Sequence, residues 1–165
     1  MNTANRVVIT TTTGAKTRAL GRRLARLLRA GDVLLLQGPL GAGKTTLAQG
    51  IGAGLKVDEP VRSPTFVLMT RHEGGALPLY HADLYRLETV EEVEDLSLDE
   101  QAADGVLLVE WPERGLDALP AHHLLVVLEP VPDEPTWRRI TVVAVGDRYR
   151  RVLDGLLAAG LADRV

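Results

Sequence analysis

The sequence predicts a layered α/β domain, because segments typical of β-strands alternate with segments typical of helices along its 165 residues. The short apolar run Val33–Gln37 suits a central parallel strand that is buried on both faces. The turn Glu73–Gly75 separates Phe66–Arg71 from Leu77–Ala82, which predicts an antiparallel hairpin. Because this length fits one domain, we expect residues 1–165 to form a single domain.

The N-terminal third is expected to hold one more strand and two helices. Arg6–Thr11 is rich in β-forming residues and opens the chain. Thr13–Ala30 has the leucine spacing of an amphipathic helix, and Gly31 stands where that helix is expected to stop. Thr45–Leu55 predicts a second helix although it contains three glycines, each of which costs up to ~1 kcal/mol of helix propensity. We therefore expect close packing against the sheet to compensate.

The C-terminal part continues the alternation of helices and strands. Its expected elements are two short acidic helices at Thr89–Leu96 and Leu98–Ala103, strands at Val106–Val109, Leu124–Leu128 and Ile140–Val145, a Pro-rich turn at Pro130–Pro135, and a final helix that Asp147 caps and Gly160 ends. The final helix has one apolar face, formed by Tyr149, Val152, Leu153, Leu156 and Leu157.

Composition excludes several classes of protein and of site. The net charge of -3 gives no global attraction to nucleic acid or to an anionic membrane, so we expect neither DNA nor a membrane as a partner. The absence of cysteine excludes disulfides, cysteine-ligated metals and a cysteine nucleophile. No apolar run approaches the about 20 residues that span a bilayer. These features favour a cytoplasmic location.

The strongest motif lies directly after the strand Val33–Gln37. It has two glycines, Gly38 and Gly43, with four residues between them, followed by Lys44 and Thr45, which is the spacing of a phosphate-binding P-loop. Glycines let consecutive backbone N–H groups point at one anion, and the following helix adds its positive N-terminal end. Lys44 supplies a charge to the phosphates, and the Thr45 hydroxyl suits Mg²⁺. The sequence therefore predicts Mg-ATP binding through Gly38, Leu40, Gly41, Ala42, Gly43, Lys44, Thr45 and Thr46.

Three further residues are candidates for metal binding or catalysis. Glu110 follows the apolar strand Val106–Val109, at the sheet edge where α/β proteins bind ligands, and could hold Mg²⁺ through water or activate the attacking water. Asp83 closes another strand, although a cap or a salt bridge to Arg86 would also explain it. Thr65 follows Pro64 in a loop that could reach the γ-phosphate, although a simple turn residue has the same pattern.

The remaining charged residues give weaker signals. The four histidines lack the helical i, i+4 pairing of a zinc site, so surface or core positions explain them better. Arg148, Arg150 and Arg151 crowd the start of the final helix, where cations are unfavourable, which makes them candidates for contact with an anion or an acidic partner.

Three other functions share the phosphate motif. A small-molecule kinase would need an Arg-rich lid, yet the stretch between Asp83 and Glu110 is acidic and Arg86 is its only basic residue. A GTP-dependent switch typically carries Asn-Lys-x-Asp, and the only asparagines here are Asn2 and Asn5. A nucleotide-dependent binding module without fast hydrolysis stays open, because carboxylates near a phosphate can bind metal without fast chemistry.

Four motifs taken together resemble the TsaE (YjeE) family, the ATPase component of bacterial tRNA threonylcarbamoyladenosine synthesis. The similarity runs from about Leu20 to Arg114 and covers, in order, Gly38-Pro39-Leu40-Gly41-Ala42-Gly43-Lys44-Thr45-Thr46, Ser63-Pro64-Thr65-Phe66, His81-Ala82-Asp83-Leu84-Tyr85-Arg86-Leu87 and Glu110-Trp111-Pro112-Glu113. The resemblance implies a three-layer, P-loop NTPase-like fold whose mostly parallel central sheet is extended by antiparallel strands. It also implies action with the TsaD and TsaB proteins, and with tRNA only indirectly through that complex.

The resemblance also implies roles for single residues. Lys44 would contact phosphate as part of the catalytic set, Thr45 would ligate Mg²⁺, and Thr65 would belong to a switch-like loop. Asp83 and Glu110 would be metal-side or catalytic carboxylates, and Trp111 would line the nucleotide site.

Two positions depart from the family pattern. Pro39 stands where the family usually has Asp and removes one backbone donor from the loop. Ser97 stands where Gly is expected, which puts the local turn in question.

Overall fold

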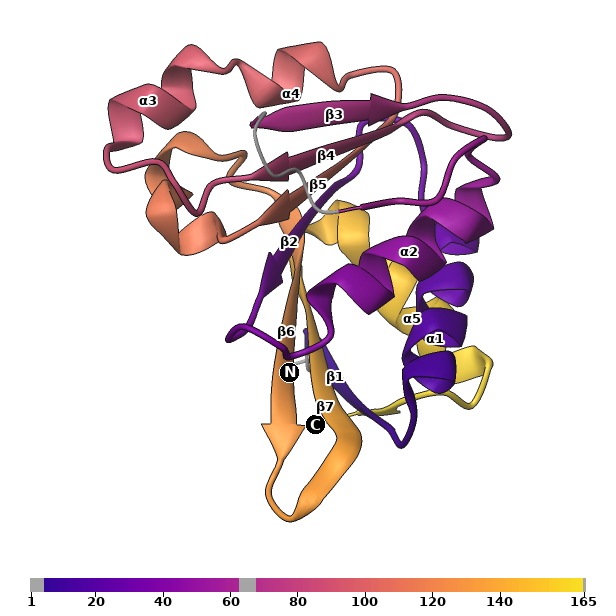
Figure 1. Ribbon diagram of the computed structural model, residues 1–165. Helices are drawn as coiled ribbons and strands as arrows, with labels where there is room; N and C mark the ends of the chain where they lie inside the picture. The colour runs from indigo at the N-terminus through magenta and orange to yellow at the C-terminus, as the bar shows by residue number, and fades with distance from the viewer. Residues whose placement is uncertain (1–4, 63–67, 165) are drawn as a thin grey trace.

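A computed structural model describes residues 5–62 and 68–164, and within them the strands form one eight-stranded sheet (Figure 1). The strands lie in the order β3-β4-β5-β2-β6-β7-β1-β8. Their bounds are β1 Arg6–Thr11, β2 Val33–Gln37, β3 Met69–His72, β4 Leu79–Asp83, β5 Val106–Glu110, β6 His123–Val131, β7 Glu134–Val145 and β8 Asp163–Arg164.

The central part of the sheet is parallel and its margins are antiparallel. Strands β4, β5, β2 and β6 run parallel to one another. The outer strands β3, β7, β1 and β8 pair antiparallel. The predicted α/β fold, with a parallel centre extended by antiparallel strands, is therefore confirmed.

Helices cover both faces of the sheet and make three layers. Their bounds are α1 Gly14–Leu27, α2 Lys44–Leu55, α3 Val90–Asp95, α4 Leu98–Gln101 and α5 Arg150–Ala158, with short 3-10 turns η1 Pro112–Arg114, η2 Leu116–Ala118 and η3 Asp147–Tyr149. Helices α1, α2 and α5 share one apolar core with the sheet, while α3 and α4 share the other (Figure 1). Strand β2 contributes Leu34 and Leu36 to the first core and Val33 and Leu35 to the second, as its alternation requires. No helix in the described ranges is long and apolar enough to cross a membrane.

Two of the three glycines of α2, Gly50 and Gly54, serve its contact with α1. A Cβ atom on Gly50 would lie 2.1 Å from the carbonyl oxygen of Arg18, and one on Gly21 would lie 2.5 Å from that of Leu47. The two helices therefore approach backbone to backbone, which only glycine permits. The expectation that these glycines pack against the sheet was wrong: Gly50 and Gly54 face α1, and Gly52 faces Val57 and Val61 in the loop after α2.

Several element boundaries differ from those expected. Helix α1 begins at its Thr13 cap but ends at Leu27, and Gly31 (φ +88°) serves the turn beyond it. Residues Pro130 and Pro135 lie inside strands β6 and β7, so the connecting turn is shorter than the expected Pro130–Pro135. Strands continue there because both lie near the tip of a two-stranded hairpin, where a missing N–H is tolerated.

The start of the final helix and the turn before α4 also differ in detail. Asp147 begins the 3-10 turn η3 rather than capping α5, which starts at Arg150. The helix ends near Gly160, whose φ of +69° fits its expected role. Ser97 adopts φ +47° and ψ +47° at the start of α4, a left-handed conformation that glycine adopts without strain. The turn is therefore retained despite the serine.

Candidate functional site

The phosphate loop joins the carboxyl end of β2 to the start of α2. Gly41 (φ +79°) and Gly43 (φ +100°) adopt left-handed conformations that other residues rarely tolerate. A Cβ atom on Gly38 would lie 2.6 Å from the carbonyl oxygen of Leu128 on β6. Ala42 is fully buried, whereas Leu40 at the tip of the loop is 87% exposed. Each glycine of the motif therefore has a structural reason.

Lys44 is the first residue of α2, and its ammonium group already lies in the loop. Its Nζ donates a hydrogen bond of 2.7 Å to the carbonyl oxygen of Gly38. The same atom lies 3.8 Å from the centre of the Trp111 ring, a cation–π contact. Burial lowers the pKa of Lys44, and the nearby carboxylates, chiefly Glu110, oppose that shift. Thr45 and Thr46 follow on the same helical turn and are half-buried.

The two candidate carboxylates end adjacent parallel strands. Asp83 closes β4, Glu110 closes β5, and the two residues are register partners across the sheet. Glu110 is also the register partner of Leu36 on β2, just before the phosphate loop. Both carboxylates thus lie at the same sheet edge as the loop, where α/β folds bind ligands. Burial raises the pKa of Asp83, while a hydrogen bond from the backbone N–H of Tyr85 to Oδ1 (2.9 Å) opposes the shift.

His81 is a member of this site that the sequence analysis assigned to the surface or core. It is fully buried on β4, and its Nε2 lies 2.7 Å from Oε2 of Glu110. An ionised carboxylate only accepts hydrogen bonds, so Nε2 is the donor. Alternation along β4 could have indicated it, because positions 81 and 83 share one face of the strand.

Aromatic side chains extend the site from Trp111 toward the surface. Trp111 adopts a left-handed conformation (φ +57°) immediately after β5. Its ring lies 4.8 Å from that of Tyr85, centroid to centroid, at an interplanar angle of 53°. Tyr85 is 52% exposed, and the guanidinium of Arg114 lies 5.4 Å from its ring centre. The chain therefore places a continuous series of ring contacts between Lys44 and solvent.

The remaining predicted candidates are Thr65 and the three arginines that crowd the start of the final helix. Thr65 falls outside the described residues. All three crowded arginines find an acidic partner inside the chain, and two of them share one: Arg148 Nε lies 2.7 Å from Oδ1 and Arg151 Nη2 lies 2.6 Å from Oδ2 of the fully buried Asp32. Arg150 instead pairs with Asp147 at 3.2 Å. Across residues 5–62 and 68–164, His, Asp and Glu form no cluster of three or more that could hold a metal.

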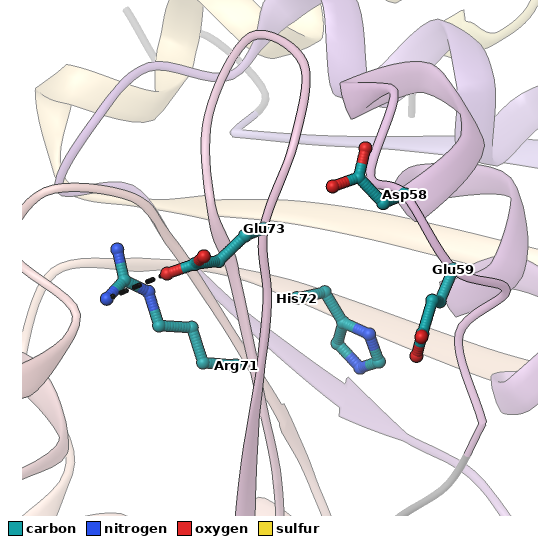
Figure 2. Close-up of a pocket in the computed structure, with 5 residues that line it drawn as sticks. All are labelled: Asp58, Glu59, Arg71, His72 and Glu73. Atoms are coloured by element: carbon teal, nitrogen blue, oxygen red, sulfur yellow. Dashed lines mark ion pairs between the residues drawn. The ribbon is translucent and has the colours of Figure 1, made fainter.

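A separate charged cavity of about 330 Å³ lies beyond the C-terminal end of α2. Asp58, Glu59, Arg71, His72 and Glu73 line it (Figure 2). Arg71 Nη1 binds Glu73 Oε1 at 3.2 Å, and burial lowers the pKa of His72. The cavity is at the opposite end of α2 from Lys44, so it is not part of the phosphate site.

Known proteins resemble this chain over most of its length. The family model described as Threonylcarbamoyl adenosine biosynthesis protein TsaE matches residues 11–140. The tRNA threonylcarbamoyladenosine biosynthesis protein TsaE of Bacillus subtilis is 43% identical over 142 residues, 86% of this chain and 87% of that protein. The protein of the same name from Streptomyces coelicolor is 45% identical over 137 residues, 80% of this chain and 93% of its own. The crystal structure of YdiB from Bacillus subtilis matches with a TM-score of 0.78 and 32% identity, covering 97% of this chain and 99% of that one.

Proposed function

The chain belongs to the TsaE family, and on that premise we propose that it is a Mg-dependent ATPase that supports turnover of the tRNA threonylcarbamoyladenosine transferase complex. One observation carries the ATPase assignment. Lys44 at the phosphate loop and the register-paired carboxylates Asp83 and Glu110 lie at one sheet edge. A phosphate-binding loop with two carboxylates beside it supplies both charge stabilisation and metal binding, the two needs of phosphoryl chemistry.

The residues of the site fit a magnesium ion and a nucleotide by their chemistry. Magnesium prefers oxygen ligands, and the Thr45 hydroxyl, Asp83 and Glu110 offer only oxygen donors. When bound, the ion would neutralise charge that develops on the phosphates. The loop Gly38–Thr46 would bind the phosphates, with Lys44 exchanging its contact with the Gly38 carbonyl for a phosphate oxygen.

Glu110 is the better candidate for orienting the attacking water. His81 holds its Oε2 in place, which fixes the orientation of the carboxylate before any substrate arrives. Asp83 has a raised pKa and is more open to solvent, which suits a carboxylate on the metal side, where a bound cation would stabilise its ionised form. The expected catalytic set is therefore Glu110, Asp83 and Lys44.

The partners proposed from the family are the TsaD and TsaB proteins, with tRNA contacted only through their complex. Because the family's relatives are named for biosynthesis on tRNA, we place the activity in the cytoplasm. The isolated chain is expected to hydrolyse ATP slowly and to be stimulated by its partners.

The deciding experiment measures Mg-ATP hydrolysis with and without purified TsaD–TsaB and tRNA, and scores threonylcarbamoyladenosine in parallel. We expect multiple rounds of modification to require this protein and to disappear with Glu110→Ala or Asp83→Ala. Glu100→Gln removes an exposed carboxylate on α4 and serves as the matched control. If the protein bound ATP but left modification unchanged, the tRNA role would be abandoned, and a screen for phosphate transfer to metabolites would follow.

A further inference from the structure

Arg138 on β7 forms side-chain hydrogen bonds to the phosphate loop. Its Nε donates to the carbonyl oxygen of Ala42 at 3.0 Å, and its Nη2 donates to that of Gly41 at 3.1 Å. Its Nη1 donates to the carbonyl oxygens of Pro135 and Trp137 in its own hairpin, at 2.9 and 2.7 Å. One planar guanidinium group therefore fixes two carbonyl groups of the loop to a rigid strand.

These two contacts set the direction of the loop's peptide groups. A trans peptide is planar, so its C=O and N–H point in opposite directions. Because the Gly41 and Ala42 carbonyls turn toward Arg138, the N–H groups of Ala42 and Gly43 turn away from it. The Ala42 N–H donates across the loop to the Pro39 carbonyl oxygen at 3.1 Å. Arg138 thus holds the backbone in a conformation in which the Ala42 N–H is bonded within the loop and the Gly43 N–H points away from Arg138.

The charge of Arg138 also acts on the loop. Among the residues that the structure describes, no Asp or Glu forms an ion pair with it, although the arginine is half-buried. A hydrogen bond to a peptide carbonyl polarises that peptide and makes its N–H more positive. An anion on the far side of the loop would therefore meet a stronger donor.

We propose that Arg138 is a positioning residue that holds the phosphate loop ready for the α- and β-phosphates of the nucleotide. The inference rests on the proposed nucleotide binding and adds a residue from outside all four family motifs. It predicts a specific pattern of affinities for ADP and ATP. Loop amides bind phosphates that ADP and ATP share. Replacing Arg138 should therefore weaken the binding of ADP and of ATP by the same factor. The KM for ATP hydrolysis should rise, and kcat should change little.

The test compares Arg138→Ala, Arg138→Lys and Arg139→Ala with the full-length wild-type chain. Arg139 is the next residue on β7 and is exposed, so Arg139→Ala removes the same charge without touching the loop contacts of Arg138. Calorimetry gives the Kd of ADP and of Mg-ATP, thermal unfolding without nucleotide reports on folding, and partner-stimulated hydrolysis gives KM and kcat. We expect Arg138→Ala to raise both Kd values about tenfold, the effect of losing charged hydrogen bonds. Arg138→Lys should fall between it and the wild type, while Arg139→Ala should leave both values unchanged.

Each result decides between specific statements. If the wild type bound neither nucleotide, the proposed function itself would fail, and the role of Arg138 with it. If the wild type bound both and Arg138→Ala bound them equally well, only the role of Arg138 would be rejected. If Arg138→Ala unfolded early, Arg138→Lys decides. A folded lysine variant with wild-type Kd values would overturn the proposal, and one with raised Kd values for both nucleotides would support it.

Discussion

Nε2 of His81 lies 2.7 Å from Oε2 of Glu110, and both side chains are almost completely buried. The two residues come from adjacent parallel strands, so the sheet itself sets their separation. A buried carboxylate is costly unless it is hydrogen-bonded, and His81 supplies such a bond. The histidine therefore orients Glu110 in addition to filling the core.

Replacing His81 should lower turnover more than nucleotide binding. His81→Phe keeps the ring volume but removes the donor, so Glu110 loses its fixed orientation. We expect kcat of partner-stimulated ATP hydrolysis to fall about tenfold or more, in line with losses of supporting hydrogen bonds at active sites. The Kd of ADP should change little, because ADP lacks the γ-phosphate that the water oriented by Glu110 would attack. His81→Gln, which can still donate, should recover part of kcat; an unchanged kcat in His81→Phe would contradict this role.

Nucleotide binding should change the fluorescence of Trp111. Lys44 Nζ lies 3.8 Å from its ring centre, and a phosphate would draw the ammonium group away. The second tryptophan, Trp137, is removed by Trp137→Phe, so that emission reports on Trp111 alone. We expect the emission of Trp111 to change as Mg-ATP is added and to saturate with the Kd that calorimetry measures. A Lys44→Ala variant should show no such change. Equal responses of both proteins would exclude Lys44 as the cause.

The fold could be predicted from sequence because its signals are local. Apolar runs such as Val33–Gln37 and Val106–Val109 predicted buried parallel strands, and both lie at the centre of the sheet. Helix ends were less accurate. Thr13–Ala30 was too long at its C-terminus, because the chain turns before Gly31 to enter β2. Glycine-rich α2 formed a helix for a reason that the sequence could not supply, since its close packing against α1 is known only from the tertiary structure.

The site was predicted only where a motif carried it. Lys44, Asp83 and Glu110 end or begin elements at one sheet edge, as their sequence context indicated, and their chemical roles stay predictions. Contacts between distant segments left no such signal. Asp32 meets Arg148 across more than a hundred residues, and Arg138 reaches the loop over a similar separation. Neither pair has a spacing that local rules could detect.

Removing the Asp32 carboxylate should destabilise the fold. It is fully buried and binds Arg148, Arg151 and the backbone N–H of Arg29, the last at 2.7 Å. Asp32→Ala would leave these donors without their shared acceptor, and we expect a loss of roughly 3 kcal/mol in the free energy of unfolding. Arg148→Ala should cost less, about 1 kcal/mol, because that side chain is 48% exposed. Urea denaturation measures both, and equal losses would contradict the central role of the carboxylate.

The close approach of α1 and α2 predicts opposite effects of one substitution at two helical glycines. Alanine adds the same methyl group at both positions and is the better helix former. In Gly50→Ala the methyl carbon would lie 2.1 Å from the carbonyl oxygen of Arg18, a backbone atom that cannot move without parting the helices. We expect a loss of about 3 kcal/mol, the upper range for overpacking. At Gly14, in the first turn of α1, nothing lies within 4 Å of the added carbon, so Gly14→Ala should be neutral or stabilise by up to ~1 kcal/mol. Urea denaturation of both variants checks the pair, and a Gly50→Ala protein as stable as the wild type would show that the helices do not pack this closely.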